Sequence, residues 1–281
     1  MTERRAIVVG DTQATLLVER LVGREHCPHV RRRLFRELAH EDGELALFLG
    51  DVVAYDAPHH WQRIDPLLDR LRARGVALAA AVGNHDVFPV PRRGIASLAR
   101  RGLVPPHRTY QERDVGNVRF VVLDSNRRVL GERAWAQQVA WLRERVAASE
   151  ASADVRALVF VTHHPPWTNS LRATDSEGTL LPFVEAFERS TKASVWLSGH
   201  VHAYERFAFG TKTLVVSGST GSPRMRLLEG AEARHADRAG LGSPGPFAWL
   251  RVHVAEDHAN AALVGFFDER EEARVLDTFA I

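Results

Sequence analysis

Over residues 6 to about 200, short apolar runs rich in β-branched residues alternate with longer stretches whose apolar residues recur at helical spacing. The short runs are 6–10, 45–50, 76–83, 158–162 and 195–199. Runs of this kind, separated by helices, predict the parallel strands of an α/β fold. Because a helix lies between consecutive strands, we expect right-handed crossovers and a largely parallel sheet.

Four stretches between these runs predict amphipathic helices, because their apolar residues share one helical face. The first stretch runs from Pro28 to His40. In chain order, the apolar faces of the four expected helices are Val30, Leu34, Phe35 and Leu38; Trp61, Ile64, Leu68 and Leu71; Trp135, Val139, Leu142 and Val146; and Leu181, Val184 and Phe187. We expect these helices to pack on the outside of the sheet.

After residue 200 the pattern changes to period-two alternation, in segments separated by glycines and charged turns. The segments are 206–209, 213–216, 248–254, 261–267 and 275–281. Alternation of this kind predicts antiparallel strands. Since the composition shows no linker between the halves, we expect one domain over residues 1–281, an α/β fold with two packed, mixed β-sheets flanked by helices.

The least regular part of the chain is the segment 217–246, which is rich in Gly, Ser, Pro and Arg. A loop of this length inside a compact domain is usually either functional or disordered. The sequence leaves two interpretations open, a mobile flap near the functional site and a disordered segment.

Composition and charge narrow the function classes. The formal net charge is only +2 and no basic stripe is present, which argues against a nucleic-acid partner. The single cysteine, Cys27, excludes an intramolecular disulfide and is typical of a reducing compartment. No apolar run approaches the roughly 20 residues of a membrane span, and the first strand begins too early to leave room for a signal peptide. We therefore expect a cytoplasmic protein with no membrane partner.

Side chains that bind metals follow each apolar run directly. Asp11 and Gln13 follow the first run, Asp51 follows the second, Asn84-His85-Asp86 the third, His163 the fourth, and His200 and His202 the fifth. The carboxyl ends of strands in an open α/β sheet line one crevice, so residues far apart in sequence converge there. Carboxylate, amide oxygen and imidazole together suit divalent metals with mixed oxygen and nitrogen ligation.

The five motifs read Gly10-Asp11-Thr12-Gln13, Gly50-Asp51, Gly83-Asn84-His85-Asp86, His163-His164-Pro165-Pro166 and Gly199-His200-Val201-His202. In this order they resemble the calcineurin-like metallophosphoesterase superfamily, in its purple acid phosphatase-like branch, whose blocks run D-x-H, G-D, G-N-H-D/E, H and G-H-x-H. Four of these blocks match fully, and the resemblance covers residues 6 to 221. It implies a four-layer α/β sandwich.

The resemblance also implies two metal ions and assigns their ligands. Asp11, Gln13, Asp51 and His202 would hold the first ion, and Asp51, Asn84, His163 and His200 the second. Asp51 would bridge the two ions. The resemblance does not distinguish among Mn, Fe, Zn and Mg. Phosphoester hydrolysis would proceed by attack of a metal-bridging hydroxide on phosphorus. His85 would protonate the leaving alkoxide or contact the phosphate, with Asp86 fixing its tautomer.

The departure from the family pattern is Gln13, which stands where the family usually has histidine. The sequence leaves open whether Gln13, through its carbonyl oxygen, or Tyr55 completes the first metal site. His59, His60 and His164 are further candidates for contact with substrate. We interpret Asp124 as a cap at the end of a strand, and Arg224 and Arg226 as surface charges in preference to a phosphate clamp.

These residues predict a metal-dependent phosphoesterase acting on a small phosphorylated compound. The missing histidine at position 13 favours a phosphomonoesterase, with a phosphodiesterase of the cyclic-nucleotide or glycerophosphodiester type as the alternative. A non-catalytic interaction module of the same fold is less favoured, because His85 and Asp86 are intact. The sequence specifies neither the physiological substrate nor the oligomeric state.

Overall fold

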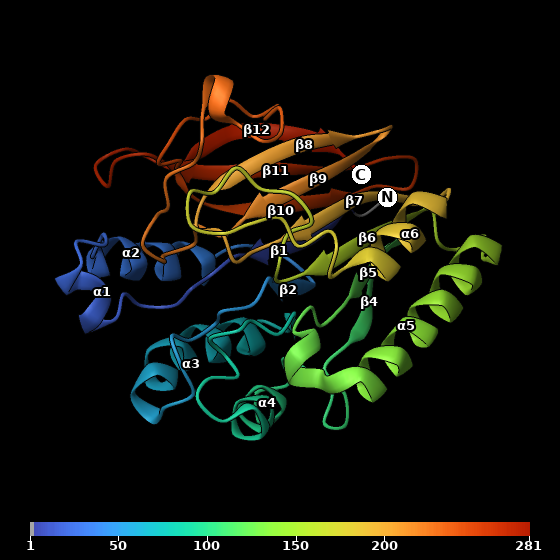
Figure 1. The fold of residues 1–281 in the computed structure, drawn as a ribbon, viewed down its shortest axis with the longest axis horizontal. Coiled ribbons are helices and arrows are strands. Elements are labelled where there is room, and N and C mark those ends of the chain that lie inside the picture. The colour runs from blue at the N-terminus through green and yellow to red at the C-terminus, as the bar shows by residue number, and fades with distance from the viewer. Residues whose placement is uncertain (1–2) are drawn as a thin grey trace.

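Two six-stranded β-sheets face each other in the computed structural model, which describes residues 3–281 (Figure 1). The first sheet has the order β12-β11-β10-β1-β2-β3. Its strands are β1 (Arg4–Val9), β2 (Leu45–Phe48), β3 (Ala77–Ala80), β10 (Phe247–Val254), β11 (Ala259–Phe266) and β12 (Arg274–Ala280). β1, β2 and β3 are parallel, and β10 joins β1 in antiparallel register and continues into an antiparallel meander.

The second sheet has the order β4-β5-β6-β7-β9-β8. Its strands are β4 (Gln111–Val115), β5 (Val118–Val122), β6 (Ala157–Thr162), β7 (Ala193–Ser198), β8 (Tyr204–Phe209) and β9 (Lys212–Ser217). The four central strands β5, β6, β7 and β9 are parallel, and the edge strands β4 and β8 are antiparallel. Both sheets are therefore mixed, as the sequence predicts.

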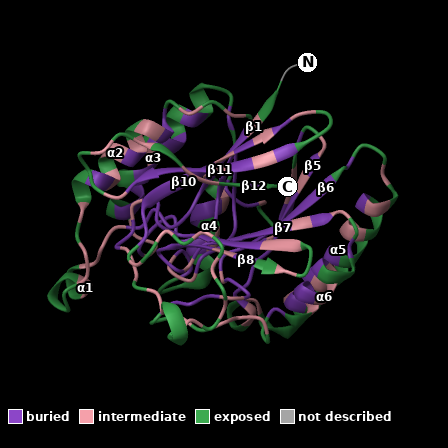
Figure 2. Cartoon of the chain, turned by 90° about the horizontal axis from the view of Figure 1, so that it is seen from above, coloured by how far each residue is buried: buried purple, intermediate pink, exposed green. Residues whose placement is uncertain are grey.

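Helices cover the outer face of each sheet, which gives four layers (Figure 2). The helices are α1 (Leu17–Leu21), α2 (Pro28–Leu38), α3 (Pro58–Ala73), α4 (Pro91–Arg100), α5 (Arg127–Ala151) and α6 (Leu181–Arg189), with a 3-10 turn at Gly230–Glu232. α2, α3 and α4 pack on the first sheet through Leu34, Leu68 and Leu98. α5 and α6 pack on the second through Leu142 and Phe183. The predicted fold class is confirmed.

The apolar runs are continuous because their strands are buried on both faces. In β2, Leu45 and Leu47 lie in the core between the two sheets. Ala46 and Phe48 point the other way, into the core under the helices. Successive side chains of a strand alternate between faces, so a strand with helices on one side and a second sheet on the other needs apolar residues at every position.

The structure adds elements that the sequence patterns do not predict. α4, the short α1 and β4 lie outside the segments for which the sequence patterns predict a helix or a strand. The segment 217–246 forms isolated bridges from Leu227 to Ser170 and from Asp237 to Phe207, which favours a structured loop over a disordered one. Among residues 3–281, no helix combines the length and the apolar character that crossing a bilayer requires.

Candidate metal centre

The seven predicted ligands come from the carboxyl ends of five strands, and these strands belong to both sheets. Asp11, Asp51 and Asn84 follow β1, β2 and β3 of the first sheet. His163 follows β6, and His200 and His202 follow β7, in the second sheet. The sequence predicts convergence at one edge of a sheet. The convergence occurs instead where the edges of two facing sheets meet.

Two ligand residues have an unusual backbone conformation. Among residues 3–281, the non-glycine residues with positive φ are Asp51, at 48°, and His200, at 69°. Conformations of this kind cost on the order of 1–3 kcal/mol and occur mainly at functional sites. The His200 backbone N–H donates to Oδ2 of Asp11 at 3.0 Å, and the His85 N–H donates to Oδ1 of Asp51 at 2.9 Å. These hydrogen bonds hold the two turns in place and fix the carboxylates.

The motif glycines allow the ligand loops to touch. A Cβ atom on Gly199 would lie 2.5 Å from Oδ2 of Asp11, and one on Gly83 would lie 2.1 Å from the backbone nitrogen of Asp51. No side chain fits at either distance, so glycine is required where the ligand loops approach each other.

The first group of ligands consists of Asp11, Asp51 and His202, whose ligand atoms all lie within 4.8 Å of one another. All three residues are buried. Nδ1 of His202 donates to the Pro223 carbonyl at 2.8 Å, so Nε2 carries a free lone pair, 3.5 Å from Oδ1 of Asp11. A histidine ligand whose second nitrogen donates to a carbonyl is the arrangement common in metal sites.

Gln13 extends this first group. Its side-chain nitrogen lies 3.1 Å from Nε2 of His202, and its buried Oε1 has no hydrogen-bond partner among the described residues. Rotation of the amide by 180° exchanges the two atoms and turns the unpartnered oxygen toward His202. A cation at this position would satisfy that oxygen, so Gln13 fits the role of a ligand.

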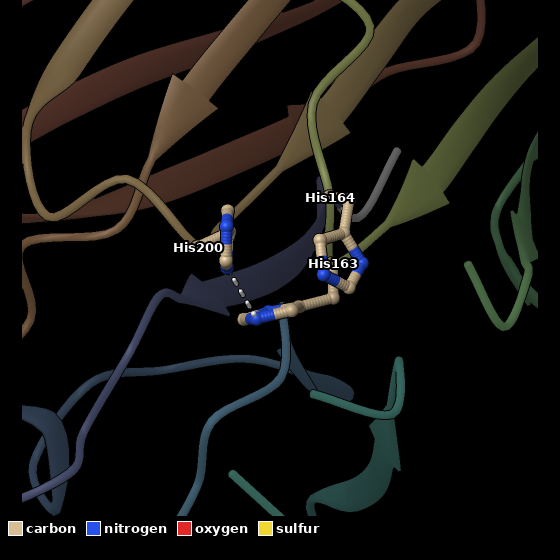
Figure 3. Close-up of side chains that lie close together, drawn as sticks. All are labelled: His163, His164 and His200. Carbon is tan, nitrogen blue, oxygen red and sulfur yellow. Dashed lines mark hydrogen bonds between the residues drawn. The ribbon is translucent and has the colours of Figure 1, made fainter. Parts of the chain in front are cut away.

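The second group surrounds Asn84. Its Oδ1 lies 3.1 Å from Nε2 of His163 and 3.1 Å from Nδ1 of His200. These two nitrogens are 3.3 Å apart (Figure 3), and Oδ1 of Asp51 lies 3.4 Å from the His163 nitrogen. Nδ1 of His163 faces the Leu49 carbonyl at 2.9 Å and donates to it. Several acceptor atoms therefore face one point, and a cation is what would hold them together.

The pKa values show how strongly this point attracts positive charge. Burial acts to lower the pKa of His163, but the negative charge of Asp51 overcomes that effect and raises it to about 10. Burial and the positive charge of His163 hold the pKa of His200 well below its ordinary value. Burial opposes ionisation of Asp51, yet the charge of His163 lowers its pKa below the usual range. The field that favours a proton on His163 favours a metal cation equally.

His164 joins the second group, although the sequence left its role open. The ligand atoms of His163, His164 and His200 lie within 4.8 Å of one another (Figure 3). The Ser125 hydroxyl forms a hydrogen bond with Nδ1 of His164 at 2.8 Å and accepts the His164 backbone N–H at 3.0 Å. Burial and the charge of His163 lower the pKa of His164 to about 3, so its imidazole is neutral.

The predicted pairing of His85 with Asp86 is wrong. Nδ1 of His85 donates to the carbonyl of Ala54 at 2.8 Å. The carboxylate of Asp86 instead accepts the backbone N–H of Gly83 at 2.9 Å and of Val53 at 3.2 Å. Successive residues of a tight turn point apart, which is why Asp86 ties together the two ligand loops while a backbone carbonyl fixes the His85 tautomer.

Side-chain contacts also bear on the roles that the sequence left open for Tyr55, Arg224 and Asp124. The Tyr55 hydroxyl lies 3.3 Å from Nε2 of His59, which favours Gln13 over Tyr55 in the first group. Arg224 pairs with Glu25 at 2.7 Å, so it is occupied elsewhere and does not clamp phosphate. Oδ1 of Asp124 accepts the backbone N–H of Asn126 at 2.8 Å, in keeping with a strand-end cap.

The groups that sequence reasoning missed are the backbone carbonyls of Leu49, Ala54 and Pro223 and the hydroxyl of Ser125. Carbonyls leave no signal in a sequence. Ser125 is the third residue after β5, so its place shortly after a strand was the one available sign.

Two adjacent groups of carboxylate, amide and imidazole ligands, sharing Asp51 and lying at the ends of strands, define the class of dinuclear metal phosphoesterases. The model of the calcineurin-like phosphoesterase family matches residues 4–204. The chain belongs to this family, which implies a dinuclear metal centre.

Similar proteins support the purple acid phosphatase-like branch. The chain is 28% identical to purple acid phosphatase 22 from Arabidopsis thaliana over 179 residues, which are 59% of this chain and 40% of the relative. This chain therefore corresponds to less than half of that relative's length. A purple acid phosphatase from yellow lupin (Lupinus luteus) superimposes with a TM-score of 0.69 at 14% identity, covering 99% of this chain and 53% of that chain. A dimetal phosphatase from Danio rerio gives 0.66 at 15% identity, covering 97% and 98%. The two structures show the shared fold.

Proposed function

We propose that this protein is a dinuclear metal-dependent phosphomonoesterase that hydrolyses a small phosphorylated substrate. The observation that carries the proposal is the pair of ligand groups around Asp51, in which Asn84, His163 and His200 direct acceptor atoms at one another within 3.3 Å. The acceptor atoms of this cluster repel one another at this distance unless a positive charge, a proton or a metal cation, lies among them.

The ligand chemistry fits two divalent ions. Gln13, with its unpartnered oxygen, joins Asp11, Asp51 and His202 around the first ion, and Asn84, His163 and His200 join Asp51 around the second. Mixed oxygen and nitrogen donors suit Mn, Fe and Zn better than Mg, which prefers oxygen. When bound, the two ions supply an activated water and neutralise charge on the phosphoryl oxygens.

The remaining work falls to side chains of this chain. Hydrolysis breaks the bond between phosphorus and the alcohol oxygen, and the departing alkoxide needs a proton. Because the Nδ1–H of His85 is engaged with the Ala54 carbonyl, the proton on Nε2 of the imidazolium form is the one that can be delivered, and it leaves the neutral imidazole behind. General acid catalysis of this kind contributes about 10²–10⁴ to the rate. His164, held by Ser125, would contact a phosphoryl oxygen.

The test compares initial rates on p-nitrophenyl phosphate and bis-p-nitrophenyl phosphate, with Mn²⁺ added and metal content measured. We expect the monoester to be the faster substrate. A rate dominated by the diester would contradict the monoesterase proposal and favour the diesterase alternative. The Asp51→Asn variant serves as the control for contaminating phosphatases, since loss of the shared carboxylate should remove both activities.

A further inference from the structure

A cavity of about 700 Å³ lies among α1, α2 and α3, on the side of the metal centre that carries Gln13. We call it the arginine pocket, because Arg20, Arg31, Arg32 and Arg63 line it together with His59 and His60. The three helices occupy the same side of the molecule (Figure 1).

The arginine pocket adjoins the first ligand group through its own backbone. Nε of Arg31 donates to the carbonyl of Thr12 at 2.6 Å, and Thr12 stands between the ligands Asp11 and Gln13. Ala14 and Thr15, the two residues after Gln13, are also part of the lining. A molecule with one end at the metal centre can therefore extend its other end into this pocket.

The pocket carries positive charge that this chain does not neutralise. Its lining contains no acidic residue, and its four arginines form no ion pair within residues 3–281. A second cavity shows the contrast, since its Arg33 and Arg251 pair with Glu37 at 2.7 Å and Glu41 at 2.6 Å. Arg31 is partly buried, and burial and the charge of Arg63 lower its pKa to about 10, so it stays charged at neutral pH.

The local backbone adds to this field. α2 begins at Pro28 and α3 at Pro58, and the residues that precede them, Cys27 and Ala57, make no side-chain capping hydrogen bond. The first N–H groups of a helix are positive and attract anions. Except for Phe35, the pocket-lining residues of both helices lie within their first two turns.

A buried polar atom at the pocket also lacks a partner. His60 is 5% exposed, it belongs to the pocket lining, and its Nε2 has no hydrogen-bond partner among the described residues. The ring packs against Tyr55 at 4.3 Å and His59 at 4.2 Å between ring centroids. A buried nitrogen without a partner costs free energy, and a polar ligand group in the pocket would supply that partner.

We propose that the arginine pocket binds a second anionic group of the substrate, so that the preferred substrates are phosphate esters whose alcohol part carries another phosphate or a carboxylate. This inference rests on the proposed phosphoesterase function. Guanidinium groups bind phosphate and carboxylate through paired hydrogen bonds. An alcohol part without charge would leave four arginines unpaired.

The experiment uses three esters of the same kind of primary alcohol: glucose 6-phosphate, 6-phosphogluconate and glucose 1,6-bisphosphate. Hydrolysis of the 6-phosphate, the primary ester that the three compounds share, is measured by product analysis with the metal-loaded enzyme. Relative to glucose 6-phosphate, we expect kcat/KM to be about tenfold higher for the bisphosphate, for the phosphogluconate or for both. A factor of about ten is the effect of one hydrogen bond between charged groups. The two charged substrates distinguish a pocket for phosphate from one for carboxylate.

The Arg63→Gln variant should raise KM for the preferred charged ester about tenfold and leave glucose 6-phosphate unchanged. Arg70→Gln is the matched control, because Arg70 is exposed on the same helix and lies outside the pocket. Equal kcat/KM for all three esters in an active enzyme, or an equal loss on all three in Arg63→Gln, would overturn the inference and leave the phosphoesterase function standing.

Calorimetric binding of glucose 1,6-bisphosphate separates the two proposals. If the metal-loaded protein releases no phosphate from any ester, the proposed function fails. Binding that weakens in Arg63→Gln and not in Arg70→Gln would still support an anion-binding pocket, and binding that is absent or unchanged in both variants would refute it.

Discussion

The imidazole of His85 is oriented by one hydrogen bond, from Nδ1 to the Ala54 carbonyl at 2.8 Å. We expect His85→Ala to keep its metal content and to lose about 10²–10⁴ in kcat on an alkyl phosphate. The loss should be much smaller on p-nitrophenyl phosphate, because nitrophenolate leaves without a proton. Steady-state kinetics on both substrates and metal analysis measure this.

The comparison of leaving groups separates two roles of His85. An equal loss on both substrates would show that His85 contacts the phosphoryl group and is not the general acid. His107→Ala, at an exposed position, is the control for a histidine substitution as such, and it should have wild-type kinetics.

A single added carbon at Gly199 should disturb the first ligand group. A Cβ atom there would lie 2.5 Å from Oδ2 of Asp11, so the carboxylate or the turn must move. We expect Gly199→Ala to lower the metal content and to destabilise the fold by about 1–3 kcal/mol, as overpacking does. Metal analysis and urea unfolding test this.

Gly178→Ala is the matched control for that substitution. A Cβ atom at Gly178 meets nothing within 4 Å, so this variant should retain its metal and its stability. If Gly199→Ala behaves in the same way as Gly178→Ala, close approach is not the reason for the glycine in the motif.

At the scale of elements, Glu205 ties β8 to the loop that follows β6. Its carboxylate accepts the Thr168 hydroxyl at 2.6 Å and the Asn169 N–H at 2.7 Å. Burial raises its pKa to about 7, against 4.5 for the ordinary group. Between these values the folded state binds more protons than the unfolded state, so this carboxyl makes stability fall as pH rises from 4.5 through about 7, and its contribution levels off above that.

The Glu205→Gln variant should reduce that fall, because its side chain does not ionise. The measurement is the free energy of unfolding of both proteins from pH 5 to pH 8, taken as a difference so that other groups cancel. A difference between the variants that is constant across this range would contradict the raised pKa.

Local sequence patterns predict strands but do not predict which sheet each strand joins. The strands of the tail alternate in the same way, yet β8 and β9 join the second sheet while β10, β11 and β12 join the first. Nothing in a period-two pattern selects the partner strand. That choice depends on which sheet edge is free after the helices have packed.

At the scale of the whole molecule, the metal centre connects the two sheets. Its ligands follow β1, β2 and β3 on one side and β6 and β7 on the other, and without cations Asp11 and Asp51 are buried like charges. Removal of the metals by a chelator should therefore lower Tm. A ligand at 100 times its Kd stabilises the fold by about 2.7 kcal/mol.

Thermal unfolding with and without EDTA measures this effect. The Asp51→Asn variant should respond less than the wild type, because it binds less metal. An unchanged Tm of the wild type, with metal loss shown by elemental analysis, would mean that the centre does not hold the sheets together.

The sequence by itself determined the alternation of strands and helices, the two-sheet α/β class and the seven candidate ligands. The elements and the positions of candidate ligands follow from local physics: side-chain period sets the element, and in an α/β fold the residue after a parallel strand lies at the sheet edge. The choice of these seven among the candidates is what the family resemblance implies. The prediction reached Asp11, Asp51 and His163 because each directly follows or nearly follows an apolar run.

Only the tertiary structure decided that two sheets supply the ligands, that Ala54 and not Asp86 orients His85, and that α1, α2 and α3 enclose a pocket lined by four arginines beside the first ligand group. The physical reason is that these features depend on backbone carbonyls and on the packing of distant segments. Neither property is encoded in the spacing of residues along the chain.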